Sequence, residues 1–202
     1  MNATNDSDMA DAAAAADNTA ADGAPDSRPT LLVVHHSPTP LLRAVRDAAL
    51  DGARHPEIEG VNVRVVEALD ATAADVLAAD AYLLGTSANF GYISGALKHF
   101  FDSTFAEYNA AAEAGDVPKG RPVSWWIRGG YDVTGAAKAI RSLTTGFGWE
   151  IAAEPVEFVG DPDDATNEKL LELGGTMAAL LMDPTTDPTM AQTMDQTMED
   201  PR

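Results

Sequence analysis

The sequence predicts an α/β domain built on a parallel sheet with right-handed crossovers. Five short apolar runs alternate along the chain with segments of helical periodicity, and most connections between them are short. The first run, residues 30–35, is continuously apolar, which is typical of a strand buried on both faces. The third run leads through a glycine-bearing loop into an amphipathic helix, and such loops lie at the ligand-binding edge of an open parallel sheet.

The first half of the domain is predicted to contain three strands and two helices. The first helix carries its apolar residues on one face and ends before Pro56, because the residue preceding a proline avoids the helical region. A valine-rich stretch then predicts the second strand, and an alanine-rich stretch predicts a short second helix. The predicted strands are residues 30–35, 61–66 and 81–85, and the predicted helices are residues 41–54 and 71–77.

The third helix is expected to begin after Ser94, whose hydroxyl can accept a free backbone N–H of the first turn. One apolar face is formed at i, i+3, i+4, i+7 and i+8 by Leu97, Phe100, Phe101, Thr104 and Phe105. Residues 106–120 include Gly115 and Pro118, so we expect a long connection there, which in a compact domain is usually functional or mobile.

Two strands and two helices complete the predicted domain. The fourth and fifth strands are residues 122–127 and 155–159, and the helices are residues 136–147 and 163–181. The pair Gly174-Gly175 lies inside the last helix and costs it about 1 kcal/mol per glycine. This cost predicts a close packing contact or a kink at that point.

The composition divides the 202 residues into a domain and two tails. Residues 1–29 and 183–202 have no apolar periodicity, and we predict that both are disordered acidic extensions of a domain over residues 30–182. The net charge is −19, and the domain itself carries 21 acidic and 11 basic residues. Such a surface argues against a nucleic-acid partner, because phosphate neutralisation needs clustered Lys and Arg.

Several classes of protein are excluded by what the sequence lacks. It has no cysteine, which excludes disulfides and thiolate chemistry. It has neither a basic, apolar signal peptide nor an apolar run near the ~20 residues that span a bilayer, so we expect a cytoplasmic protein without membrane insertion. The pair His35-His36 is not expected to bind a metal, since neighbouring residues of a strand point to opposite faces.

Three loops should open at one edge of the sheet and suit a flat ligand that carries a phosphate. The first offers the Ser37 and Thr39 hydroxyls and the N–H groups of Leu41, Leu42 and Arg43 at a helix start, where anions bind readily; alternatively, the hydroxyls only cap the helix. In the other two loops the backbone could approach a planar ring at Asn89, Gly91, Gly129 and Gly130. Three aromatic residues could stack on that ring or only pack at its rim: Phe90, Tyr92 and Tyr131.

The second loop and its helix carry a resemblance to a known family. Residues 85–102 read Gly-Thr-Ser-Ala-Asn-Phe-Gly-Tyr-Ile-Ser-Gly-Ala-Leu-Lys-His-Phe-Phe-Asp. This segment resembles the Gly-Thr-Pro-x-x-Phe-Gly-x-Met-Ser-x-x-x-Lys-x-Phe-x-Asp pattern of the flavodoxin-like flavoproteins, in the branch of NAD(P)H-dependent FMN reductases and Wrb-type quinone reductases. The resemblance covers about residues 30–181 and implies a three-layer flavodoxin-like sandwich with strand order 2-1-3-4-5.

The resemblance also implies the cofactor and its contacts. The backbone of Ser87, Ala88, Asn89, Phe90, Gly91 and Tyr92 would wrap the flavin ring of FMN. The third loop, with Gly129, Gly130, Tyr131 and Asp132, is a weaker match to the family. The family's phosphate loop, Ser-x-Thr-Gly-x-Thr, is matched at Ser37 and Thr39, but Pro40 replaces the glycine and Leu42 the last threonine. Arg43 either compensates for this loss or is only solvated.

The implied function is an FMN-dependent oxidoreductase in which NAD(P)H is the co-substrate and a quinone, another flavin or a similar small molecule accepts electrons. No side chain need act as acid or base, since the flavin carries the chemistry. Two alternatives stay open: a flavodoxin-type electron carrier without its own hydride-transfer activity, and a flavin-free binding module. Because members of the family often pair across the flavin site, we expect a homo-oligomer.

Overall fold

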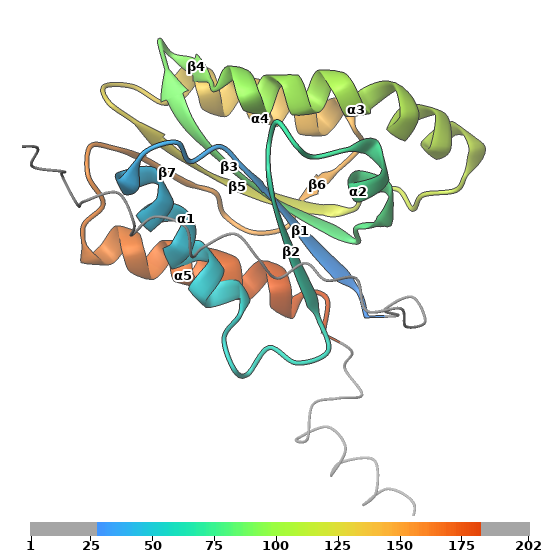
Figure 1. Cartoon of the computed structure of the whole chain (residues 1–202), viewed down its shortest axis with the longest axis horizontal. Coiled ribbons are helices and arrows are strands. Elements are labelled where there is room, and N and C mark those ends of the chain that lie inside the picture. Colours follow the sequence, from blue (N-terminus) through green and yellow to red (C-terminus); the bar gives the residue numbers. More distant parts are fainter. Residues whose placement is uncertain (1–27, 183–202) are drawn as a thin grey trace, which may run out of the picture.

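The computed structural model describes residues 28–182, which form a sheet with helices on both faces (Figure 1). The strands are β1 (Thr30–His35), β2 (Asn62–Glu67), β3 (Ala81–Asn89), β4 (Tyr92–Ile93), β5 (Pro122–Gly129), β6 (Glu150–Ile151) and β7 (Val156–Val159). The helices are α1 (Pro40–Ala53), α2 (Ala73–Ala78), α3 (Gly95–Ala114), α4 (Thr134–Gly146) and α5 (Asp164–Ala179). The predicted tails lie outside the described residues, apart from residues 28 and 29.

The sheet runs in the order β2-β1-β3-β5, and both β6 and β7 pair with β5. Every strand is parallel to its neighbours except β4, which forms an antiparallel hairpin with β3. Since β5 and β7 are the fourth and fifth predicted strands, the predicted order is confirmed. The sequence prediction lacks β4 and β6, which are two residues long and too short to show a periodicity.

Apolar side chains fill both faces of the sheet, because successive residues of a strand point to opposite faces. From β1, Leu32 and Val34 enter the core that α2, α3 and α4 cover, whereas Leu31 and Val33 enter the core of α1 and α5. In Figure 1 the first group of helices lies above the sheet and the second below it. Burial on both faces explains why the β1 run is apolar without alternation.

Helix α3 is longer than predicted and continues to Ala114. Tyr108 is buried and packs on Phe147 and Trp149, with ring centroids 5.2 and 5.8 Å away. The prediction of a long connection over residues 106–120 is therefore wrong. The alanine-rich first part of this segment favours a helix, and the contacts of Tyr108 with Phe147 and Trp149 hold that helix in place. No helix between residues 28 and 182 is long and apolar enough to span a bilayer.

Candidate functional site

Three loops leave the carboxyl ends of β1, β3 and β5 at one edge of the sheet, on the left in Figure 1. Strand β1 ends at His35, opposite Gly85, while β3 continues for four more residues to Asn89. Strand β5 continues beside it, since Ala88 pairs with Gly129. At about 3.3 Å per residue, the edge therefore rises by roughly 13 Å from β1 to β3. The loop between β1 and α1 lies at the foot of this step.

The upper part of the step is the β3–β4 hairpin, which replaces most of the irregular loop expected after Gly85. Its turn is formed by Phe90 and Gly91, with φ angles of 52° and 75°. Two positive φ values are the mark of a type I′ hairpin turn, which twists in the same sense as the strands it joins. A loop was expected because the small polar residues of this stretch lack strand periodicity.

Hydrogen bonds fix the base of the hairpin to the start of α3. The Thr86 hydroxyl donates to Ser94 Oγ at 3.0 Å and accepts from the Ser94 N–H at 3.1 Å. Ser94 Oγ in turn accepts from the Leu97 N–H, which confirms the predicted N-cap. On its other side the hairpin approaches α4 so closely that a Cβ at Gly135 would lie 2.1 Å from the Gly91 carbonyl oxygen.

In the first loop the residues expected to bind an anion also build the helix start. Thr39 is the N-cap of α1, and its hydroxyl accepts from the Leu42 N–H at 3.2 Å. The Arg43 N–H donates to the Thr39 carbonyl at 2.9 Å. Two of the three N–H groups expected to face a ligand are thus occupied, and the Leu42 side chain is buried in the core. Ser37 is 4% exposed, and its hydroxyl has no hydrogen-bond partner among the described residues.

The third loop is held at both ends. Asp132 Oδ1 accepts from the Thr134 hydroxyl at 2.7 Å and from its N–H at 3.2 Å, and these bonds lower the pKa of Asp132. Arg128 donates from Nε to the Gly160 carbonyl at 2.8 Å and from Nη2 to Asp161 at 3.3 Å. These contacts join the ends of β5 and β7 and orient the exposed part of the loop.

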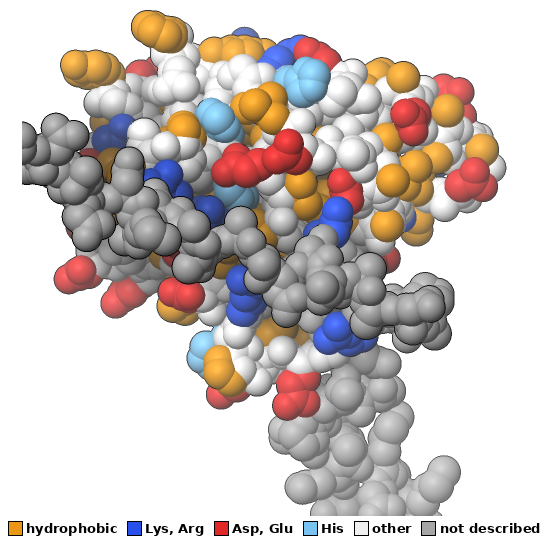
Figure 2. Space-filling view, in the orientation of Figure 1, with side chains coloured by type: hydrophobic (Ala, Val, Ile, Leu, Met, Phe, Trp, Pro, Cys, Tyr) orange, Lys and Arg blue, Asp and Glu red, His pale blue; other side chains and the backbone are white. Residues whose placement is uncertain are grey.

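Two aromatic side chains stand free at the tips of neighbouring loops. Phe90 and Tyr131 are 109% and 99% exposed, the highest values among the large hydrophobic residues of 28–182, and Tyr92 is half-exposed. Phe90 and Tyr131 follow the paired residues Ala88 and Gly129 by two positions each. Hydrophobic side chains project from the same end of the molecule in Figure 2. Exposed aromatic rings that gather in this way are typical of a binding surface.

His35 and His36 both approach the same carboxylate, so the expectation that they diverge is wrong. Their Nδ1 atoms lie 3.5 and 3.8 Å from the two carboxylate oxygens of Glu67. The reason is that β1 ends at His35, so His36 no longer follows the alternation of the strand. The part of the chain that the structure describes contains no group of three acidic, His or Cys side chains placed to hold a metal ion.

The structure brings every predicted cofactor-binding residue to this one edge, and it adds two anchoring residues that the predicted set does not include. Thr86 anchors the hairpin, and Arg128 anchors the third loop. Arg43, which the sequence already places at the first loop, donates from Nη1 to the Pro38 carbonyl at 3.2 Å and so covers this loop. Its place in the first turns of α1 is a sequence signal for this contact, since side chains on a helix lean towards the N-terminus.

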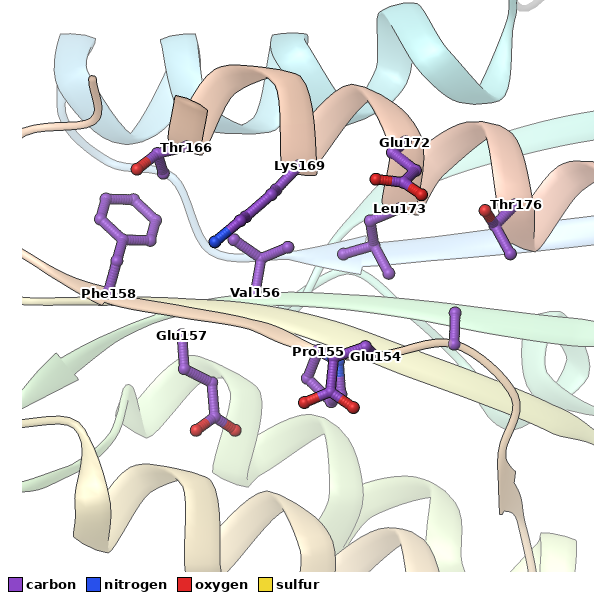
Figure 3. Close-up of a pocket in the computed structure, with 11 residues that line it drawn as sticks. Glu154, Pro155, Val156, Glu157, Phe158, Thr166, Lys169, Glu172, Leu173 and Thr176 are labelled. Carbon is purple, nitrogen blue, oxygen red and sulfur yellow. The ribbon is translucent and has the colours of Figure 1, made fainter. Parts of the chain in front are cut away.

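A cavity of about 490 Å³ lies away from these loops, between β7 and α5. Figure 3 shows Lys169 reaching from α5 towards Val156 and Phe158, while Glu157 points to the other side of the strand. There Glu157 accepts a hydrogen bond from the Trp125 indole at 2.9 Å. A smaller cavity of about 280 Å³ touches the hairpin and α4 at Tyr92 and Gly135. The candidate site is an open step and not an enclosed pocket, so we identify it from the strand register and the exposed rings.

The sequence has limited similarity to a curated protein, and no protein-family model matches it. It is 32% identical over 77 residues to a flavodoxin of Aquifex aeolicus (strain VF5). The match spans 38% of this chain and 40% of the length of that protein.

The structure is similar to solved structures over most of its described part. A flavodoxin from the domain Archaea superposes with a TM-score of 0.62 at 20% identity, covering 75% of this chain and 98% of that one. Flavodoxin 1 from Bacillus cereus gives 0.59 at 15% identity, with 76% and 99% covered. A flavodoxin, WrbA-like protein from Agrobacterium tumefaciens gives 0.56 at 16% identity, with 77% and 98% covered. The chain therefore has the flavodoxin-like fold.

Proposed function

We propose that the chain binds FMN at the stepped edge of its sheet and acts as an FMN-dependent oxidoreductase. The observation that carries this proposal is the pair of fully exposed rings, Phe90 and Tyr131, at the tips of adjoining loops. A soluble domain leaves such rings uncovered where they meet a ligand, and a flat aromatic ring is their natural partner. The 32% identity to a flavodoxin supports the same cofactor.

The residues at the foot of the step fit the phosphate end of FMN. Ser37 supplies a hydroxyl without a partner among the described residues, and Leu41 supplies a backbone N–H at the start of α1. The helix dipole favours an anion at the same place. Pro40 provides no N–H, so this loop offers fewer backbone donors than the family pattern.

Bound FMN would supply the redox chemistry, with NAD(P)H as reductant and a quinone, flavin or similar molecule as acceptor. The chain's own residues would bind and orient it. Phe90 and Tyr131 would cover the ring, and the hydrogen bonds of Thr86 and Asp132 would keep the two loop tips in position before the ligand arrives. Backbone N–H groups near the ring would stabilise negative charge that develops on it.

An electron carrier of the flavodoxin type is the second candidate. The acidic surface favours it, since residues 28–182 carry 21 acidic and 12 basic side chains and could dock on a basic partner. A carrier would use the same FMN site but would not react directly with NAD(P)H.

FMN titration of the purified full chain, followed by flavin fluorescence and the visible spectrum, tests the site. We expect Phe90→Asn and Tyr131→Ala each to weaken FMN binding about ten-fold, the loss of one stacked ring. Asn suits position 90 because it tolerates positive φ and leaves the turn intact. Leu180→Ala, which shortens a half-exposed side chain at the far end of α5, is the matched control. A chain that binds no FMN would instead be a flavin-free module.

Anaerobic stopped-flow mixing of the FMN-loaded chain with NADH or NADPH separates the two redox candidates. Prompt bleaching of the flavin absorbance is expected for the oxidoreductase. No bleaching by either nucleotide, with normal reduction by dithionite, would identify the carrier.

A further inference from the structure

The loop between β1 and α1 has few backbone donors left for an anion. Pro38 and Pro40 have no N–H, and the N–H groups of His36, Leu42 and Arg43 are already bonded within the protein. Within this loop, three N–H groups have no acceptor among the described residues: those of Ser37, Thr39 and Leu41. A further, cationic donor would strengthen the binding of a doubly charged phosphate monoester here.

Arg43 is placed to be that donor. Its side chain folds back from α1 over the loop, and Nη1 donates to the Pro38 carbonyl at 3.2 Å. No carboxylate of the described residues lies within ion-pair distance of it, whereas Arg46 pairs with Asp47 at 2.7 Å and Arg128 with Asp161 at 3.3 Å. Figure 2 shows basic side chains over α1 in a chain whose net charge is −19. The Arg43 guanidinium is thus exposed beside the loop, and its remaining N–H groups are available to bind a ligand.

The Ser37 hydroxyl points to a ligand independently of Arg43. Ser37 is 96% buried, since its exposed fraction is 4%, and its hydroxyl has no hydrogen-bond partner in residues 28–182. Ser37 Oγ is not among the fully buried side-chain atoms that lack a partner in this part of the chain, so it reaches the surface of the loop and is free to donate to a ligand. An acceptor bound between the loop and Arg43 would satisfy it.

We propose that Arg43 is the residue that makes this site select phosphorylated over unphosphorylated flavin. The inference rests on the proposed function, because it assigns the phosphate end of the same FMN site. FMN and riboflavin share the ring and the ribityl chain and differ only in the phosphate. The planar guanidinium can donate two parallel hydrogen bonds to phosphate oxygens and replaces the donors lost at Pro40 and Leu42.

The test compares the affinities of the full apo chain for FMN and riboflavin, each measured by quenching of flavin fluorescence. We expect Arg43→Ala to weaken FMN about ten-fold or more, as for a charge-assisted hydrogen bond, and to leave riboflavin unchanged. Arg43→Lys keeps the positive charge but cannot donate two parallel hydrogen bonds, so it should retain only part of the preference for FMN. Arg54→Ala, an exposed arginine just past the other end of α1, should change neither affinity.

Each remaining outcome is decisive. If Arg43→Ala weakens both flavins equally or neither, Arg43 does not select the phosphate and the inference is wrong, while the proposed FMN site stands. If the unaltered chain binds neither flavin, the proposed function fails and the inference fails with it. A weaker salt dependence of FMN binding in Arg43→Ala, with no such change for riboflavin, would give further support.

Discussion

His35 is buried at the end of β1, and its Nδ1 atom has no hydrogen-bond partner among the described residues. The pKa of His35 is lowered from 6.5 to about 4, chiefly by burial and also by the charges of Arg46 and His36, which outweigh the opposing effect of Asp47. Glu67 also faces the ring, at 3.5 Å from Nδ1. At neutral pH the side chain therefore stays uncharged, two residues before Ser37 in the candidate site.

A destabilisation in mild acid follows from this lowered pKa. Between the unfolded pKa of 6.5 and the folded pKa of about 4, the unfolded chain binds a proton that the folded chain does not, so stability is lost as the pH falls. From about pH 7 to about pH 5 the loss from this one group is about 2 kcal/mol. Urea unfolding at both pH values should therefore show a smaller loss for His35→Gln than for the unaltered chain. Equal losses in both proteins would mean that His35 is not buried as a neutral group.

At the scale of elements, α1 and α5 cross at two glycines. A Cβ at Gly52 would lie 1.8 Å from the Leu171 carbonyl oxygen, and a Cβ at Gly174 would lie 1.8 Å from the Ala49 carbonyl oxygen. Backbone atoms occupy both places, so neither contact can relax through a side chain. The close packing contact predicted from Gly174-Gly175 is confirmed, and of the two positions only Gly174 has no room for a Cβ.

Adjacent alanine substitutions in α5 should have opposite effects. Gly174→Ala forces the two helices apart and should lower the free energy of unfolding by about 1–3 kcal/mol, the usual cost of overpacking. Gly175→Ala meets its nearest neighbour, the Gly52 carbonyl oxygen, at an ordinary 3.6 Å and should gain about 1 kcal/mol of helix propensity. Chemical denaturation of the two variants checks the pair, and a stable Gly174→Ala protein would contradict the crossing.

At the scale of the whole molecule, charge repulsion opposes the compact state. Residues 28–182 carry 21 acidic and 12 basic side chains, and several of the basic ones already belong to surface ion pairs such as Lys98–Asp102 and Arg128–Asp161. Exposed pairs of this kind contribute only about 0–1 kcal/mol each, so they do not offset the excess of negative charge. The expected homo-oligomer and cytoplasmic location stay predictions at this scale.

Salt is therefore expected to stabilise the folded chain. From about 0.01 M to about 1 M salt the Debye length falls from about 30 Å to about 3 Å, which screens repulsion between the carboxylates. Urea unfolding in KCl should show a free energy of unfolding that rises with salt. The double substitution Glu154→Gln and Glu172→Gln, beside the cavity of β7 and α5, should make the rise smaller. A fall in stability with salt would show that ion pairs outweigh the repulsion.

The strand adjacency was implied by the family resemblance, and a cap at Thr39 was one of two open interpretations. The sequence by itself determined the order of strands and helices along the chain and the cap at Ser94. These features depend on periodicity and on contacts a few residues apart, which a single chain displays. It also placed the candidate site at the loops after the first, third and fourth predicted strands, because parallel strands bring their carboxyl ends to one edge.

Only the tertiary structure decided the contacts between distant segments. It extended β3 beyond β1 into a hairpin, continued α3 under Phe147 and Trp149, and brought His35 and His36 to one carboxylate. It also separated Gly174 from Gly175, since a Cβ at Gly174 would collide with the α1 backbone whereas a Cβ at Gly175 would lie at an ordinary distance from it. These features arise from packing and register between segments far apart in sequence, which local patterns do not encode.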